Sequence, residues 1–181
     1  MPYHGLLWRV DQRDTPQGSV DFHLAHKEGI LHRAINVVPF RDPGRKTVLL
    51  TLRGDIGGEG LWQLGGIDHV GHGLCWQGAA LQCMNEQPLY SQQRDPVAFE
   101  IGDPLFHSSP RGSHRDNRSN CEIVRPACCT LTYEPTLHPE CLRRYEWISL
   151  DQLLKDIASE PAKYTHTCRL VARKLATARL S

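Results

Sequence analysis

The sequence predicts one α+β domain over residues 1–181, an α/β/α sandwich in which helices cover both faces of a mixed sheet. Three observations support this fold class. Short apolar stretches separated by turn residues fill the first third of the chain, as in a succession of strands. A glycine-rich loop leads from a strand into an alanine-rich helix in the middle, and two amphipathic helices follow a strand near the end.

Length and composition exclude several classes of protein. The 181 residues suit a single core, and no repeat or linker divides them. The 21 basic and 20 acidic residues give a formal charge of +1, so we expect no nucleic-acid partner. No apolar run approaches a membrane span and the N-terminus lacks a signal-peptide core, so we expect a cytoplasmic protein without membrane contact. The seven cysteines include no Cys-x-x-Cys pattern, which predicts reduced and mostly buried thiols.

The first 53 residues predict three strands joined by turns. Strands are expected at 6–11, 34–40 and 47–53, where apolar and β-branched residues are concentrated. Residues 14–18 and 41–45 contain proline and glycine, which favour turns. The second of these turns makes a hairpin of the strands on either side.

The middle of the chain holds the element around which the rest is organised. Trp62 and Leu64 alternate with a polar residue, as in a short half-buried strand. Gly65 and Gly66 follow, and a β-carbon there would obstruct the close approach of two backbones. The helix expected at Ala79–Glu86 begins beside a glycine-rich loop, so its free N–H groups favour a phosphate ligand.

Residues 91–133 predict a loop between two strands. A short strand is expected at 97–101, and the segment 108–118 is polar with proline and glycine. We expect this segment to be an exposed loop, with a lid over a site as the functional alternative. The next strand is expected at 121–133, either whole or divided at Pro126.

The end of the chain predicts one strand and two helices. The strand is expected at 144–148, Ser149 is expected to cap the first helix, and the second helix is expected to span 164–180. The expected buried stripes are Leu150, Leu153, Leu154 and Ile157 in the first helix, and Leu170, Val171, Leu175 and Ala178 in the second.

The Gly-Gly loop and the helix after it resemble the Nudix box, in which an acidic helix holds divalent cations against a diphosphate. The match is partial. His72 stands near the position of the first glutamate, Gln82-Cys83 replaces an Arg-Glu pair, and only Glu86 remains of the final acidic pair. A plain structural turn before an alanine-rich helix is the alternative interpretation.

Further segments carry a more specific resemblance. They are Val-Asp-Gln-Arg-Asp-Thr-Pro-Gln-Gly, Ala-His-Lys-Glu-Gly-Ile-Leu-His-Arg-Ala, Cys-Glu-Ile-Val-Arg-Pro and the Glu-Trp-Ile ending. With them, residues 8–175 resemble the type of Nudix protein that includes isopentenyl-diphosphate isomerase. In that family, three histidines and two glutamates enclose a divalent cation, and a helix glutamate holds a second cation with the substrate diphosphate. The resemblance implies a first site at His26, His32, His69 and Glu122, with Asn120 in place of the other glutamate, and a second at Glu86.

The types of residue in the first site are suitable ligands for a metal ion. Three imidazoles and a carboxylate suit Mn, Fe or Zn, and the cofactor expected for the chain is a divalent Mg, Mn or Zn ion. A chance grouping among ten histidines is the alternative. Four of the other histidines are assigned to surface or capping positions: His4, His107, His138 and His166.

The resemblance fails where the isomerase transfers protons. Ile67 stands in the place of the family's cysteine, two residues before the third histidine, and an alkyl group cannot transfer a proton. The candidates for acid/base catalysis are Glu122 and Asp68, with Cys75 as an alternative to Asp68. The resemblance also implies substrate contacts at Arg53, Glu86 and Tyr164.

Three functions therefore compete. The first is a metal enzyme resembling the isomerase, which acts on an isoprenoid or related diphosphate by protonation-type isomerisation or cyclisation. The second is a Nudix diphosphate hydrolase, which the scarcity of carboxylates in the box disfavours. The third is a Nudix fold kept as a binding module without turnover. In each case the expected partner is a small-molecule diphosphate, and the substrate and oligomeric state stay open.

Overall fold

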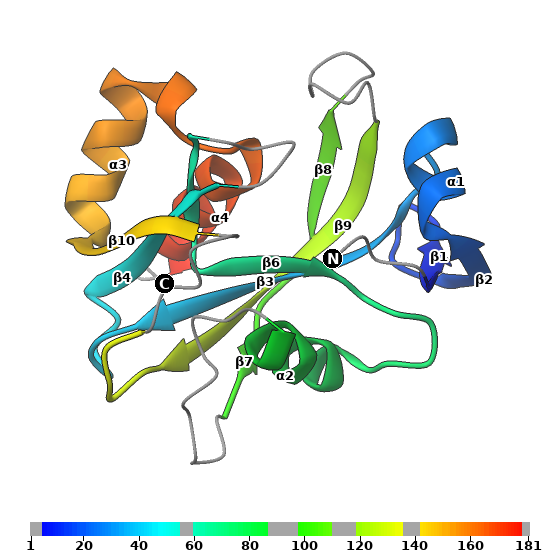
Figure 1. The fold of residues 1–181 in the computed structure, drawn as a ribbon, viewed down its shortest axis with the longest axis horizontal. Coiled ribbons are helices and arrows are strands. Elements are labelled where there is room, and N and C mark those ends of the chain that lie inside the picture. The colour runs from blue at the N-terminus through cyan, green and yellow to red at the C-terminus, as the bar shows by residue number, and fades with distance from the viewer. Residues whose placement is uncertain (1–4, 55–59, 87–97, 110–118, 136–141, 179–181) are drawn as a thin grey trace.

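The computed structural model describes residues 5–54, 60–86, 98–109, 119–135 and 142–178 (Figure 1). Its strands are β1 Leu6–Val10, β2 Pro16–Asp21, β3 His32–Phe40, β4 Thr47–Arg53, β5 Trp62–Leu64, β6 Gly66–His69, β7 Glu100–Ile101, β8 Leu105–Ser109, β9 Asn120–Thr130 and β10 Leu142–Ser149. Its helices are α1 Phe22–Glu28, α2 Trp76–Glu86, α3 Leu150–Ser159 and α4 His166–Ala178, with a short 3₁₀ turn at Pro161–Lys163.

The sheet is built around β3. This strand runs parallel to β9 and antiparallel to β1, β4 and β6. The sheet continues through β10 beyond β4 and through β2 beyond β1, while β7 and β8 pair with β9. Because parallel and antiparallel pairs occur together in a sheet packed against helices, the predicted α+β class with a mixed sheet is confirmed.

The two faces of β3 belong to different core layers. Ile35 and Val37 pack with residues of α2, whereas Val38 and Phe40 pack with residues of α3 and α4. Side chains alternate along a strand, so odd-numbered residues of β3 face α2 and even-numbered residues face the other layer. Figure 1 shows α2 separated from α3 and α4, as the predicted sandwich requires.

Several predicted elements appear close to their expected bounds. The Ser149 hydroxyl accepts a hydrogen bond from the amide of Gln152 at 3.1 Å and caps α3. The central helix is longer than predicted, because α2 already begins at Trp76. The predicted strand at 121–133 is a single strand, β9, which continues through Pro126.

Other elements correct the predictions. Helix α1 was not predicted; Asp21 accepts hydrogen bonds from its first amides and Gly29, at φ 66°, ends it. The strand β2 begins inside the predicted turn 14–18. The strand β8 includes the start of the predicted loop 108–118, and residues 110–118 lie outside the described residues, as do residues 136–141.

The packed side of α4 also differs from the predicted one. Ala178 is exposed, and Thr167, Cys168, Val171 and Ala172 are buried instead. Small side chains at Cys168 and Ala172, four residues apart, let this side of the helix lie close to the sheet. Six of the seven cysteines are described, all as free thiols, and four of them are buried as predicted. Within the described residues, no helix is both long and apolar enough to cross a membrane.

Asp14 fixes the β1–β2 turn against the middle of the sheet. Its backbone is left-handed, with φ 63°, and its side chain is buried. The carboxylate accepts hydrogen bonds from Nε of Arg33 at 2.6 Å and from Nη2 of Arg125 at 3.0 Å. Both guanidinium carbons lie 5.1 Å from the ring centroid of Trp76. One carboxylate therefore joins the turn to β3, β9 and the start of α2.

We expect Asp14→Asn to lower the free energy of unfolding by about 2–4 kcal/mol, because it removes the shared anion of two partly buried arginines. Asparagine tolerates a left-handed backbone, so the variant tests the charge rather than the turn. Urea unfolding followed by tryptophan fluorescence measures the loss. Glu100→Gln is the matched control, since Glu100 pairs with Arg45 at the surface and its charge should contribute less than about 1 kcal/mol. Equal losses in the two variants would contradict this role of Asp14.

Candidate metal centre

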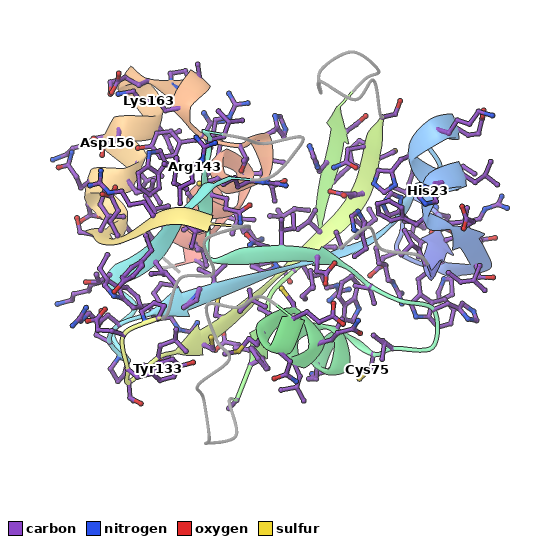
Figure 2. All side chains as sticks on the ribbon, viewed as in Figure 1. His23, Cys75, Tyr133, Arg143, Asp156 and Lys163 are labelled. Atoms are coloured by element: carbon purple, nitrogen blue, oxygen red, sulfur yellow. The ribbon has the colours of Figure 1, made fainter. Side chains whose placement is uncertain are left out.

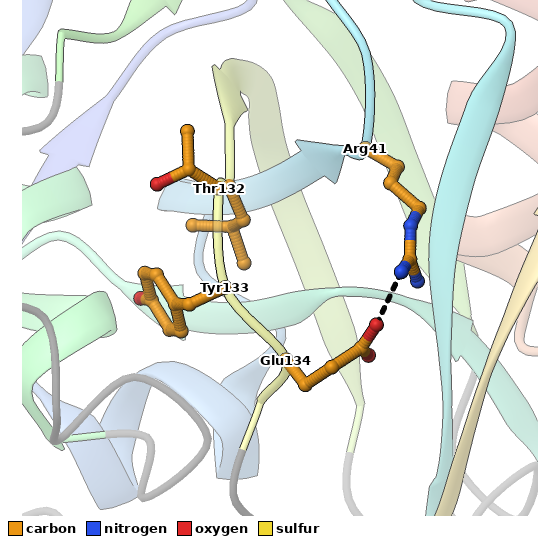
Figure 3. A pocket seen from close by; sticks show the side chains of 5 residues that line it. Arg41, Thr132, Tyr133 and Glu134 are labelled. Atoms are coloured by element: carbon orange, nitrogen blue, oxygen red, sulfur yellow. Dashed lines mark ion pairs between the residues drawn. The ribbon is translucent and has the colours of Figure 1, made fainter.

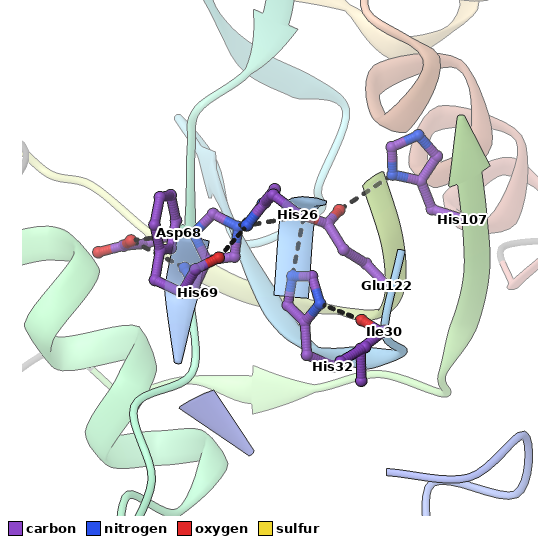
Figure 4. A network of polar contacts seen from close by, with 8 residues as sticks. His26, Ile30, His32, Asp68, His69, His107 and Glu122 are labelled. Atoms are coloured by element: carbon purple, nitrogen blue, oxygen red, sulfur yellow. Dashed lines mark hydrogen bonds and ion pairs between the residues drawn. The ribbon is translucent and has the colours of Figure 1, made fainter. Parts of the chain in front are cut away.

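Four side chains from four elements converge near the start of β3. His26 lies on α1, His32 begins β3, His69 ends β6 and Glu122 lies near the start of β9. Each offers one potential ligand atom, and these four atoms lie within 4.8 Å of one another (Figure 4). His26, His32 and Glu122 are buried, while the side chain of His69 is 20% exposed.

The register of the sheet explains why the side chains face the same way. His32 pairs with Glu122 across the parallel β3–β9 pair, and Ala34 pairs with His69 across β3–β6. Paired residues point to the same face of a sheet, as do residues two apart on one strand. His26 enters from α1, where its ring lies 4.3 Å from that of Phe22 between centroids.

Backbone carbonyls orient two of the imidazoles. Nδ1 of His26 lies 2.8 Å from the carbonyl oxygen of Phe22, and Nδ1 of His32 lies 2.7 Å from that of Ile30. A carbonyl oxygen only accepts, so Nδ1 of each ring carries the proton and donates it. The unprotonated Nε2 atoms then face the centre, which is the tautomer that a metal-binding histidine needs.

Glu122 supplies the negative charge of the centre. Its Oε1 lies 3.3 Å from Nε2 of His69 and 3.8 Å from Nε2 of His32. Burial alone would raise the pKa of Glu122, but hydrogen bonds from His107 and His69 outweigh it and hold the pKa well below its usual range. The carboxylate is therefore ionised at neutral pH.

The donor set fits a divalent cation. Nε2 of His32 is buried and has no hydrogen-bond partner within the described residues. Nε2 of His26 lies only 3.2 Å from Nε2 of His69. Lone pairs this close to one another and to a carboxylate repel unless a proton or a cation lies between them. Nitrogen-rich sets of this kind suit Zn, Mn or Fe, whereas Mg²⁺ prefers oxygen ligands.

We expect the metal-free protein to lose stability in mild acid through His32. Burial, followed by the charge of His69, lowers the pKa of His32 from 6.5 to about 4. The folded state keeps this ring neutral while the unfolded chain protonates it. Its contribution is therefore complete above pH 6.5 and is lost as the pH falls toward 4, by up to about 1.4 kcal/mol per pH unit.

Urea unfolding in EDTA between about pH 7 and pH 5 measures this dependence. His32→Asn is the comparison, because its amide can still donate to the carbonyl of Ile30 but does not titrate. The variant should lose stability less steeply than the wild type as the pH falls. Parallel curves for the two proteins would show that His32 is not the group responsible.

Asp68 and Glu86 lie toward the other face of the sheet. Asp68 pairs with Ile35, which packs against α2, whereas its neighbour His69 faces the four-residue cluster. Burial raises the pKa of Asp68, and the charge of Glu86 raises it further against the opposing effect of His69. Oδ1 of Asp68 remains 3.9 Å from Nδ1 of His69. The structure therefore does not bring Asp68 or Glu86 into the cluster.

The other predicted positions also lie apart from the cluster. Arg53 ends β4, and Tyr164 packs beneath α3 and α4, where burial raises its pKa to about 12. Cys75 is exposed in the loop before α2 (Figure 2). His72 is exposed as well, with its ring 4.3 Å from that of Trp8.

His107 contacts the cluster although its position in the sequence does not predict a role there. Its assignment to a surface or capping position is wrong, because it is buried on β8 with Nδ1 3.0 Å from Oε2 of Glu122. Its ring stacks on that of the exposed His166, 5.0 Å away between centroids. Predicting a strand at 105–109 would have revealed His107 as a candidate, because the β8–β9 register places it opposite Glu122. His4 and His138 fall outside the described residues.

A pocket of about 250 Å³ lies near the opposite end of β3 and β9 (Figure 3). Its lining residues are Arg41, Leu131, Thr132, Tyr133 and Glu134. The guanidinium of Arg41 and the carboxylate of Glu134 form an ion pair at 2.5 Å. The two ends of β3 are roughly 25 Å apart in an extended strand, so this pocket is separate from the His26, His32, His69 and Glu122 cluster.

Sequence comparisons do not assign the chain to a family. No protein-family model matches it, and no curated protein matches it.

Solved structures match across most of the chain. The protein DR0079 from Deinococcus radiodurans superposes with a TM-score of 0.67 over 93% of this chain and 98% of its own, at 17% identity. A MutT Nudix hydrolase from Burkholderia pseudomallei gives 0.58 over 79% and 96%, at 15% identity. The Nudix domain of Shewanella oneidensis NrtR, solved with ADP-ribose, gives 0.54 over 83% and 88%, at 15% identity.

At these identities the similarity shows the fold. The chain has a Nudix-like fold, with a mixed sheet and helices on two faces. None of these three structures is described as an isoprenoid isomerase. The comparisons thus support the Nudix part of the predicted resemblance and add nothing to its isomerase part.

Proposed function

We propose that this chain is a divalent-metal enzyme that hydrolyses a small organic diphosphate, with the ion held by His26, His32, His69 and Glu122. The observation that carries the proposal is the convergence of four donor atoms within 4.8 Å, one of them the unpartnered Nε2 of His32. A buried acceptor without a partner within the described residues reduces stability. A bound cation would accept the lone pair of this nitrogen and remove the cost, which explains why a buried ring nitrogen is left without a protein partner there.

A divalent ion held by these four residues would supply Lewis-acid chemistry and an activated water for hydrolysis. The residues of the chain prepare the site for it. The carbonyl groups of Phe22 and Ile30 hold two imidazoles in the ligating tautomer, and Glu122 is ionised and would contribute a negative charge to the site. His69 is the most exposed member, so substrate is expected to approach from its side.

One structural neighbour supports hydrolysis, and another supports a diphosphate ligand. Structural neighbours include a protein described as a Nudix hydrolase, and a neighbouring Nudix domain was solved with ADP-ribose, which contains a diphosphate. The helix α2, where a Nudix box would carry its acids, contributes only Glu86, too few carboxylates for a two-metal mechanism. We therefore assign the reaction to the His/Glu centre. The predicted substrate contacts of Arg53, Glu86 and Tyr164 gain no support from this geometry.

The experiment that tests the proposal begins with metal analysis of protein purified without added ions. The metal-loaded protein is then screened against nucleoside, sugar and isoprenyl diphosphates, and the monophosphate products are separated by chromatography. The expected result is about one tightly held ion per chain and metal-dependent hydrolysis of at least one compound. Absence of metal binding would overturn the proposal. Metal and diphosphate binding without turnover would replace it with the binding-module function.

Acid/base isomerisation is the second candidate, because a buried carboxylate beside imidazoles is suited to proton transfer. This reaction also needs a second proton donor, and the residue at the position where the resemblance implies one cannot transfer a proton. Ile67 lies on β6 two residues before His69, so the two side chains share a face of the sheet. An isoleucine there leaves Glu122 without an opposing acid.

We expect the wild-type protein to incorporate little or no deuterium into isopentenyl diphosphate. Ile67→Cys places a thiol on the side of the sheet that His69 occupies. It should raise any trace exchange, with about 10²-fold as the scale of one acid/base group. Mass spectrometry of the recovered diphosphate measures the exchange, and Ile67→Val is the control without a thiol. Rapid exchange by the wild type would mean that another residue supplies the proton.

A further inference from the structure

The two carboxylate oxygens of Glu122 have different surroundings. Oε1 faces Nε2 of His69 at 3.3 Å and Nε2 of His32 at 3.8 Å. Oε2 lies 3.0 Å from Nδ1 of His107, which comes from β8 on the other side of β9. The β8–β9 register puts His107 directly opposite Glu122, so the contact belongs to the sheet itself. Figure 4 shows the carboxylate between the cluster and His107.

The hydrogen bond fixes the tautomer of His107. An ionised carboxylate only accepts, so Nδ1 of His107 must carry the proton that it donates. Nε2 is then an acceptor, and it is buried with no hydrogen-bond partner within the described residues. An apolar residue at this position would leave Oε2 of the buried carboxylate without this donor, which costs more than the unpaired Nε2 of His107. The pair is therefore better explained by its effect on Glu122.

We propose that His107 is a positioning residue that holds Glu122 to one-oxygen ligation and thereby sets the coordination number of the centre. This inference rests on the proposed metal-binding function. A carboxylate can bind a cation through one oxygen or through both. With Oε2 engaged by His107, the chain offers three imidazole nitrogens and one oxygen. Three nitrogens and one carboxylate oxygen would leave a position open for water or substrate and would favour Zn²⁺ or Co²⁺ over Mg²⁺, so His107 would help to select the ion.

Three substitutions separate the hydrogen bond from the ring. His107→Asn places an amide donor near the position of Nδ1 and should preserve the contact with Glu122. His107→Gln places its donor one bond farther out, near the position of Nε2, and should lose it. His107→Phe keeps an aromatic ring beside His166 but has no donor. His166→Asn is the control, because His166 stacks on His107 and, within the described part of the chain, is not a hydrogen-bond or ion-pair partner of Glu122.

The probe is Co²⁺, added to the metal-free protein and followed by visible absorption, with affinity measured by competition against a chelator. The wild type, His107→Asn and His166→Asn should give closely similar visible spectra and affinities within about threefold of one another. His107→Phe and His107→Gln should bind about 10–100-fold more weakly, with the weaker absorption expected when the second carboxylate oxygen also binds and raises the coordination number. A merely structural role would change stability but not the spectrum of the bound ion.

The outcomes separate this inference from the proposed function. If the wild type binds neither Co²⁺ nor Zn²⁺, the proposed function fails. If the wild type binds Co²⁺ and the Phe and Gln variants give the same affinity and spectrum, only the role of His107 fails. Circular dichroism and thermal unfolding establish that each variant is folded. If His107→Phe does not fold, the comparison of His107→Asn with His107→Gln decides the matter in the same way.

Discussion

His69→Ala is expected to abolish stable metal binding, and with it any metal-dependent turnover. The variant removes one of four donors and leaves Glu122 and the other two histidines to hold the ion. Mutating a residue that only hydrogen-bonds to a metal ligand typically lowers metal affinity by about 10–100-fold. The loss of a ligand itself should therefore reduce the affinity by more than about 100-fold. Metal content after dialysis and the rate of diphosphate hydrolysis should fall together.

The matched control is His72→Ala. His72 is exposed beside Trp8 and lies outside the cluster, so its removal should leave metal content and activity within about twofold of the wild type. Zn²⁺ should also raise the melting temperature of the wild type and of this control, because it binds only the folded state. A His69→Ala protein that keeps the full metal content would rule out the proposed ligand set.

Gly65→Ala is expected to lower the free energy of unfolding by about 2–5 kcal/mol. Gly65 adopts φ 48°, which is left-handed, and a β-carbon there would overlap the carbonyl oxygen of Val37. It would also lie 2.5 Å from Cδ of Pro39. Both obstacles belong to the rigid central strand β3, so neither can move without disturbing the sheet. Urea unfolding measures the loss.

Gly78→Ala is the control for Gly65→Ala. Gly78 lies inside α2, where an added β-carbon would meet its nearest neighbour, Sγ of Cys75, at an ordinary 3.5 Å. Alanine favours a helix over glycine by about 0.5–1 kcal/mol, so this variant should be slightly more stable than the wild type. The same chemical change thus has opposite expected signs at two positions. Similar losses in both variants would contradict the close-approach role of Gly65.

The regular parts of the fold could be predicted from the sequence because local patterns determine them. The apolar runs on either side of the turn at 41–45 predict β3 and β4, and the Ser149 cap with its leucine stripe predicts α3. Helix α1 could not be predicted in this way. It is seven residues long, too short to be stable alone, and depends on the Asp21 cap and the burial of Phe22.

The candidate site was only partly accessible from the sequence. The resemblance to a family named the four residues that the structure brings together, but periodicity and spacing alone did not select them. Their convergence depends on the pairing of β3 with β6 and β9, which is a tertiary property. Strand alternation then separates Asp68 from His69, although they are neighbours in the chain. His107 could not be predicted as a site residue, because the sequence of β8 has no recognisable strand pattern.

The parallel pairing of β3 with β9 has a consequence for how the protein would acquire and keep the proposed ion. His32 and Glu122 are paired in this ladder although about ninety residues separate them in the chain. Contacts over such separations slow folding, because closing a long loop costs conformational entropy before the contacts compensate for it. The complete ligand set therefore exists only once this long-range pairing has formed. An ion bound there should slow unfolding far more than it speeds folding, so it would set the lifetime of the native state.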